Sequence, residues 1–213
     1  MNKPWRVLGR LWPVGVVAGI AIPVFARAPR PEPVTPDGVR TIEDAVTESR
    51  GSGLSGWALV DHVQQLTHRK FASYSILTPW ESPAVAFRNS RGNPNQYNGA
   101  LNEILNRLGL QTELVFASRV RSQNRPWWRV GHVWVRVRID RVTRDVDAGT
   151  VDGGAGKVDF VPLTQVRRFR RLTYLNTSVV WSLLAAYQVW RSILLRQPLP
   201  AWTHHPLGQP VAE

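Results

Sequence analysis

The chain has no cysteine among its 213 residues. This absence excludes disulfide bonds, thiolate metal sites and thiol catalysis together. Acidic residues are scarce as well, since 15 Asp and Glu stand against 27 Lys and Arg, leaving a formal net charge of +12. Nearly all of the positive charge is arginine, because lysine occurs only at Lys3, Lys70 and Lys157. Such a surface favours anionic partners, namely a membrane surface, acidic polymers or nucleic acid, unless it is simply solvated.

The first 28 residues follow the order of an export signal. Three basic residues and no acid occupy positions 1–10, an uncharged run covers 11–25, and Ala26-Arg27-Ala28 places small residues two apart. The apolar run is shorter than the roughly 20 residues that a membrane-spanning helix needs. We predict a signal peptide or an uncleaved membrane anchor over 1–28. The protein is therefore expected to be exported, and extracytoplasmic or membrane-associated.

A proline-rich linker is predicted over residues 29–52. Four prolines between 29 and 36 favour an extended, mobile tether, and Arg50-Gly51-Ser52-Gly53 is typical of a turn at a domain boundary. The folded domain is expected over 53–165. The chain's 43% hydrophobic residues and ten tryptophans indicate a folded protein with a core rather than a disordered one.

Two helices are predicted in the first half of this domain. Apolar residues three or four apart predict a helix over 57–71, and residues 72–93 are predicted to be loop. The second helix has the clearest boundaries. Asn93 is a good N-cap, Pro94 suits the first turn, and Gly109 ends the helix.

Consecutive strands are predicted to follow. After a strand at 114–117, residues 130–139 alternate strictly, with valines on one face and His132 among the residues on the other. A turn at Asp140-Arg141 and a returning strand over 143–147 complete a hairpin. A helix followed by consecutive strands predicts an α+β fold rather than alternating βαβ units.

The hairpin carries two residue types of an acyl-transfer site. Such a site needs a nucleophile at a helix amino terminus, a histidine base, and an acid or amide that fixes the imidazole tautomer. His132 lies on the first strand and Asp147 ends the second. We expect the hairpin to bring these two side chains together on one face.

Four stretches of sequence occur in a set order. They are Arg91-Gly92-Asn93-Pro94-Asn95-Gln96-Tyr97-Asn98-Gly99, Leu108-Gly109-Leu110, His132-Val133-Trp134-Val135-Arg136-Val137 and Asp145-Val146-Asp147-Ala148-Gly149. In this order the chain resembles the transglutaminase-like superfamily over about residues 55–150. The runs Gln96-Tyr97-Asn98-Gly99 and Val146-Asp147-Ala148-Gly149 also resemble arylamine N-acetyltransferases, which share the papain-like core of that superfamily.

The resemblance implies a papain-like core, with a helix packed on an antiparallel sheet and a cysteine at the start of the helix. Counted back from Leu108-Gly109, the position of that cysteine falls on Pro94, or on Asn95 if the register slips by one. Neither side chain is a nucleophile. The resemblance therefore implies the fold without the activity, with His132 and Asp147 as relic base and orienting acid and Pro94 at the vacant nucleophile position.

We therefore predict an exported, membrane-proximal, transglutaminase-like domain that has lost thiol acyl-transfer and protease activity and acts as a binding or structural module. One alternative is a hydrolase or acyltransferase with a non-cysteine mechanism centred on His132 and Asp147, with Ser90 as a candidate nucleophile. Another is a basic protein that binds lipid or nucleic acid, nucleic acid being less expected because no nucleic-acid module is recognised. Simpler roles also remain: Asn93-Pro94 is explained by helix capping, and Asp147 can buttress the hairpin through His132.

No cofactor or metal ion is expected. The histidines lack the spacing of zinc ligands; they are His62, His68, His132, His204 and His205. The glycine-rich residues 151–157 lack the spacing of a phosphate-binding loop and are predicted to be a flexible loop.

The carboxy-terminal third begins with a basic stretch over 166–171, which precedes an uncharged run over 172–190. This run predicts a helix within a segment 166–200, and three surroundings fit it. The helix can span a membrane, lie at a membrane surface as an amphipathic helix, or pack on the domain. Residues 201–213 are predicted to be a disordered tail.

Overall fold

The structure is a computed structural model that describes residues 19, 21–123 and 129–207. Its larger sheet is antiparallel, with the strand order β5-β4-β3-β6 and β7 also paired with β3. The α+β prediction with an antiparallel sheet is confirmed at this level. The strands are β3 (Gln111–Ser122), β4 (Arg129–Ile139), β5 (Val142–Val146), β6 (Phe160–Pro162) and β7 (Arg167–Arg168).

A smaller sheet joins distant parts of the chain. Its order is β2-β1-β8, with β1 parallel to β2 and antiparallel to β8. Its strands are β1 (Ser73–Ser75), β2 (Arg91–Gly92) and β8 (His204–Pro206). The carboxy-terminal residues are thereby held against the middle of the chain.

The helices begin where their capping residues dictate. Asn93 caps α5, and the side chain of Gln96 accepts a hydrogen bond from the Asn93 backbone, which completes a capping box ahead of Pro94. Thr41 and Asp44 form the same motif at the start of α2. The helices are α2 (Ile42–Gly51), α3 (Gly56–Lys70), α4 (Pro83–Arg88), α5 (Pro94–Arg107) and α6 (Arg171–Leu195), with 3-10 turns η1 (Pro36–Gly38) and η2 (Ala201–Thr203).

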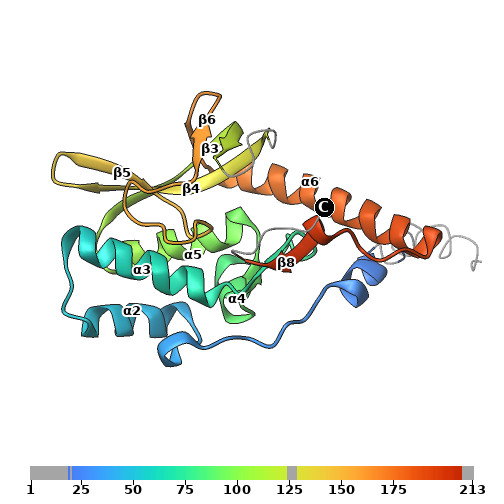
Figure 1. Cartoon of the computed structure of the whole chain (residues 1–213), viewed down its shortest axis with the longest axis horizontal. Helices are drawn as coiled ribbons and strands as arrows, with labels where there is room; N and C mark the ends of the chain where they lie inside the picture. The colour runs from blue at the N-terminus through green and yellow to red at the C-terminus, as the bar shows by residue number, and fades with distance from the viewer. Residues whose placement is uncertain (1–18, 20, 124–128, 208–213) are drawn as a thin grey trace, which may run out of the picture.

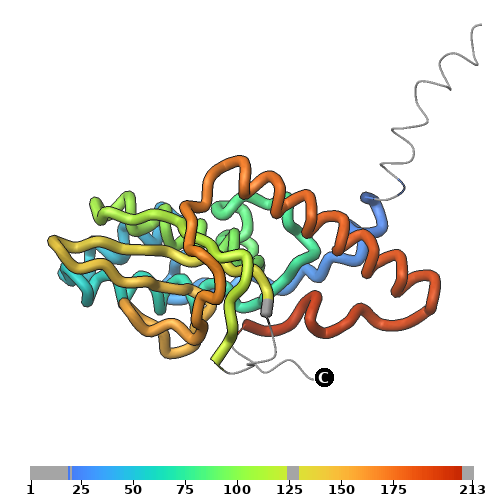
Figure 2. Tube along the Cα trace, turned by 90° about the horizontal axis from the view of Figure 1, so that it is seen from above, coloured from blue at the N-terminus to red at the C-terminus, as the bar shows by residue number. Residues whose placement is uncertain are grey.

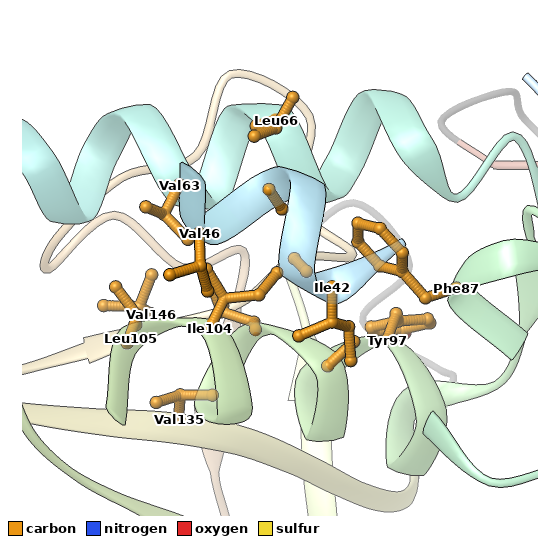
Figure 3. Close-up of a cluster of buried hydrophobic side chains, with 14 of the residues drawn as sticks. Ile42, Val46, Val63, Leu66, Phe87, Tyr97, Ile104, Leu105, Val135 and Val146 are labelled. Carbon is orange, nitrogen blue, oxygen red and sulfur yellow. The ribbon is translucent and has the colours of Figure 1, made fainter. Parts of the chain in front are cut away.

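Helix α5 forms the centre of the molecule. It lies between the larger sheet and a layer made of α2 and α3 (Figure 1). Ile104 and Leu105 of α5 meet Val46 of α2 and Val63 of α3 on one side, and Val135 of β4 on the other (Figure 3). Because α5 packs on both sides, its first turn is fixed relative to β4.

Helix α6 extends along the long axis of the molecule, away from this core (Figure 2). Residues 21–27 are helical, and Val24 and Ala28 are buried against Ala185 and Val189 of α6. The returning chain after α6 contributes Trp202 to the same cluster. Within the described part of the chain, only one side of α6 therefore makes contacts.

The structure corrects two expectations on the amino-terminal side. Residues 42–51, assigned to the linker, form α2, whose Ala45 and Val46 are buried in the core. Residues 29–35 have no regular secondary structure and are bound to the domain, since the Val34 carbonyl accepts a hydrogen bond from Lys70 Nζ at 2.6 Å. The linker prediction failed because capping and core contacts join these residues to the domain.

Three further expectations are corrected. Residues 72–93 are not all loop, because they contain β1, α4 and β2. Residues 201–207 are no disordered tail, since β8 pairs with β1 and His205 stacks on Tyr74. The glycine-rich residues 151–157 are packed on α3, where Asp61 Oδ1 accepts a hydrogen bond from the Ala155 amide at 2.6 Å. Residues 1–18 and 20 of the predicted signal, and 208–213 of the tail, lie outside the described residues.

Candidate functional site

The hairpin of β4 and β5 positions His132 and Asp147. The strands pair in register from Val135 opposite Val146 to Ile139 opposite Val142, and the chain turns at Asp140, whose φ is 55°. His132 lies on β4, and Asp147 follows the last residue of β5. Their side chains meet, with His132 Nε2 2.9 Å from Asp147 Oδ2. The expected pairing of the two residues is thus present in the structure.

The imidazole of His132 is held by aromatic rings as well. Its ring makes an edge contact with Phe160 of β6 at 4.7 Å between centroids, and it stacks with Trp134 at 6.3 Å. Phe160 and Trp134 are themselves buried. The His132 side chain is 15% exposed, whereas that of Asp147 is 3% exposed. Solvent therefore reaches only an edge of the imidazole.

Asn98 connects the hairpin to α5. Its Nδ2 donates to Asp147 Oδ1 at 2.7 Å and to the Val133 carbonyl at 2.7 Å, and its Oδ1 accepts from the Ala148 amide at 2.9 Å. One amide side chain thus joins α5, β4 and the residues after β5. This role of Asn98 was not predicted from the sequence. A polar residue one turn after the start of the helix could have indicated it.

The carboxylate of Asp147 has a full set of partners. Besides His132 and Asn98, the Gly149 amide donates to Oδ1 at 3.0 Å and Thr150 Oγ1 donates to Oδ2 at 3.4 Å. Gly149 has no room for a side chain, because an added Cβ would lie 2.8 Å from Tyr97 Oη. Asp147 and its neighbours therefore form a closed network against α5.

Electrostatics keep Asp147 ionised. Burial raises the pKa of Asp147, but the charge of His132 and hydrogen bonds from His132, Asn98 and Gly149 outweigh burial, so the pKa falls below its ordinary value. Burial and the charge of Asp147 raise the pKa of the neighbouring Asp159. Thr150 Oγ1 joins the two carboxylates, at 3.2 Å from Asp159 Oδ1.

Pro94 begins α5 one turn before Asn98. Residues four apart in a helix share a face, so Pro94 lies on the side of α5 that carries Asn98. The alternative position, Asn95, is buried and donates from Nδ2 to Thr177 Oγ1 of α6 at 3.1 Å. The start of α5 thus offers neither a thiol nor a hydroxyl at the two positions where the resemblance puts the nucleophile.

Ser90 is occupied elsewhere. It is buried with a φ of 56°, and its Oγ lies 3.0 Å from both Lys70 Nζ and the backbone amide of Val34. Burial lowers the pKa of Lys70 to about 8. The Ser90 hydroxyl therefore belongs to the contact that holds residues 29–35, and its partners include no histidine.

The other histidines and acids form no metal centre among the residues that the structure describes. His62 Nε2 lies 2.8 Å from Glu48 Oε2, and His68 Nδ1 lies 2.9 Å from the Ala148 carbonyl. These contacts tie α3 to α2 and to the residues after β5.

A hollow of about 560 Å³ lies along α5, separate from His132. Its polar lining includes Asn102 and Asn106 of α5, and its far side is made by Phe169, Arg170 and Tyr174. The volume is within the range of small-ligand sites. Neither His132 nor Asp147 lines it.

Comparisons with known proteins give limited similarity. A scan against protein-family models finds no match, and a search of curated proteins finds none. Among solved structures, the chain is similar to a TGase, with a TM-score of 0.40 and 14% sequence identity. The similarity covers 50% of this chain and 30% of the TGase chain, so the matched part is under a third of that protein's length.

Proposed function

We propose that this chain is a transglutaminase-like domain without thiol acyl-transfer or protease activity, which serves as a binding or structural module. The observation that carries the proposal is the pairing of an intact His132–Asp147–Asn98 network with a proline at the helix start. A base and its orienting acid cannot form an acyl-enzyme intermediate unless a nucleophilic side chain faces them. Pro94 suits the first turn of α5, but its side chain has no nucleophilic group.

The network supports a structural role for the same residues. Asp147 accepts from β4, α5 and the residues that follow it, so its loss would weaken the link between the hairpin and α5. A buried carboxylate that is fully bonded stabilises one arrangement of the elements around it. Selection for this arrangement does not require turnover.

We further propose that the domain works outside the cytoplasm and close to a membrane. The order of basic and apolar residues at the chain start supports export. The apolar helix α6 supports a location near lipid. The absence of cysteine is compatible with an oxidising compartment.

Restoring the nucleophile tests the proposal directly. The purified chain is expected to show no acyl transfer or amide hydrolysis above that of His132→Ala. In Pro94→Cys, the thiol would sit at a helix amino terminus one turn from Asn98, so its pKa is expected below about 7.5. The pH dependence of iodoacetamide alkylation measures this pKa, and the chain contributes no other thiol.

Val142→Cys is the matched control, because Val142 is exposed and lies on a strand of the hairpin rather than at the first turn of a helix. Its thiol is expected to titrate near the ordinary value of about 8.5. Adding His132→Ala to Pro94→Cys should raise the pKa of the thiol, while the helix amino terminus keeps it below the control value. A Pro94→Cys thiol that titrates like the control and ignores His132 would refute the assignment of Pro94 to the nucleophile position.

A second candidate function rests on the exposed edge of the imidazole. With 15% of its side chain exposed, His132 can reach a water molecule and act as a general base without a protein nucleophile. Amide hydrolysis by the wild-type chain that disappears in His132→Ala would favour this candidate over the non-catalytic one.

A further inference from the structure

Helix α6 presents an apolar face to the outside of the molecule. Leu172, Leu183 and Leu194 lie along one side of the helix and are 75%, 67% and 74% exposed. Other large apolar residues surround this line. We define the outer face of α6 by its exposed members, Leu172, Leu175, Val179, Val180, Leu183, Tyr187, Leu194 and Leu195.

The side of α6 that faces the protein is apolar with two polar residues among its buried members. Gln188 and Ser192 are buried there, at helical spacing from Ala185 and Val189. Gln188 Oε1 has no hydrogen-bond partner among the described residues. A surface helix of a water-soluble domain has mainly polar residues on its exposed side, whereas the outer face of α6 is mainly large apolar residues. This exposed apolar face indicates that a nonpolar medium covers it.

The charges around α6 complement an anionic lipid surface. Between Asp159 and Glu213 the sequence contains no acidic residue. The exposed arginines stand at both ends of the outer face; they are Arg167, Arg168, Arg170 and Arg171 before it, and Arg191 and Arg196 at its far end. Arginines close to anionic lipid headgroups strengthen membrane binding. A second copy of this chain, packed on the outer face, would place its own arginines near those of the first copy, and the like charges would repel.

The contacts of α6 determine how it can meet a bilayer. By length and composition it is the one helix among the described residues that could cross a membrane, and its 25 residues extend about 37 Å. A helix that crosses the bilayer alone has lipid on all sides. The inner side of α6 instead packs on Ile76, Leu77 and Val24 and on the returning chain with Trp202. In Figure 1, helix 21–27 and this returning chain lie below α6.

We propose that α6 lies in the plane of an anionic bilayer, with its outer face in the lipid and its inner side on the domain. The arginines at its two ends then contact lipid phosphates, while the leucines enter the boundary between headgroups and acyl chains. The inference rests on α6 alone, so it holds whether or not the His132 network is catalytic.

Single cysteines give a depth measurement on the full chain, since no native cysteine interferes. Nitroxide labels are placed by Leu172→Cys, Leu183→Cys and Leu194→Cys, with Val142→Cys as the exposed control on the hairpin. The chain is reconstituted in vesicles of phosphatidylcholine and phosphatidylglycerol at a ratio of about 2:1. Accessibility to oxygen and to a water-soluble nickel chelate then reports the depth of each label.

An in-plane helix is expected to give three equal depths, about 5–10 Å below the headgroups, with the control in water. A depth that is greatest at Leu183 and small at both ends would show a spanning helix and overturn the proposal. Labels as accessible to water as the control would overturn it too. A doubled mass in the same sample would then identify a second copy as the cover.

A charge variant tests the lipid phosphates separately. Arg170→Gln with Arg171→Gln is expected to raise the access of the nickel chelate to the Leu172 label at least about fivefold, because each arginine near the surface contributes binding energy. Arg138→Gln with Arg141→Gln makes the same change in net charge on the exposed end of the hairpin and should have no effect. Equal effects of the two pairs would contradict a local contact with phosphates.

Discussion

Helices α5 and α6 distribute their side chains in opposite ways. Helix α5 buries Leu101, Ile104 and Leu105 in the main core, and its buried polar residue Asn98 bonds to three groups. Helix α6 exposes Leu172, Leu183 and Leu194 and buries Gln188, whose Oε1 has no hydrogen-bond partner among the described residues. The difference teaches that α5 is stabilised within this chain, whereas the outer face of α6 gains stability only from something that covers it.

The largest expected effect compares one leucine from each helix. Leu105→Ala removes a fully buried side chain between the sheet and α2, and should lower the free energy of unfolding by about 2–5 kcal/mol. Leu183→Ala on the outer face should change it by less than about 0.5 kcal/mol in the absence of lipid. Urea denaturation of both variants measures the difference. Similar losses would mean that α6 is buried in solution.

The second effect compares the buried amides of the two helices. Asn98→Ala leaves Asp147, the Val133 carbonyl and the Ala148 amide short of one partner each, and should cost about 2–3 kcal/mol. Gln188→Leu removes an amide whose oxygen is unpaired among the described residues, so it should be neutral or stabilising. Thermal unfolding of the two variants measures both changes in stability. A Gln188→Leu variant clearly less stable than wild type would contradict the contrast between the two amides.

The third effect is a dependence of the free energy of unfolding on pH, which arises from Asp147 beside α5 and has no counterpart in α6. The pKa of Asp147 is lower in the folded state than in the unfolded chain, so the unfolded chain binds the proton more tightly. The stability that Asp147 contributes is therefore complete above the unfolded value of about 4 and is lost as the pH falls through the folded value.

Denaturation of wild type and Asp147→Asn between pH 7 and about pH 3 measures this dependence. The variant should be less stable at pH 7 and should lose less stability on acidification. The apolar run of α6 has no acid or base of comparable pKa, so Leu183→Ala should keep the wild-type slope. A wild-type slope in Asp147→Asn would show that another group controls the acid response.

The smallest effect concerns the contact between the two helices. Asn95 Nδ2 donates to Thr177 Oγ1, and Thr177→Val removes this neutral hydrogen bond at nearly constant volume. The expected loss is about 1 kcal/mol by urea denaturation. Ser122→Val, at a partly buried position on β3, serves as the control for the introduced valine. A loss much above this size would mean that α6 depends on α5 more than the contacts indicate.

Much of the helix and strand pattern was predictable because its causes are local. Asn93 and Pro94 define the start of α5, and the alternation around His132 defines β4. The capping box at Thr41 and Asp44 is also a local signal, and it predicts the start of α2. The prolines before it favoured a linker over these residues, so α2 was not predicted. The short strands β1 and β8 could not be predicted, because each pairs with a partner distant in the sequence.

The sequence by itself determined that no thiol chemistry occurs, that Pro94 opens α5, and that His132 and Asp147 belong to one hairpin. These properties follow from composition, capping and strand alternation, which act between neighbouring residues. Only the tertiary structure decided that Asn98 closes the network and that Leu172, Leu183 and Leu194 of α6 face outward. The physical reason is that helical periodicity identifies the sides of a helix, but packing against distant residues decides which side is buried.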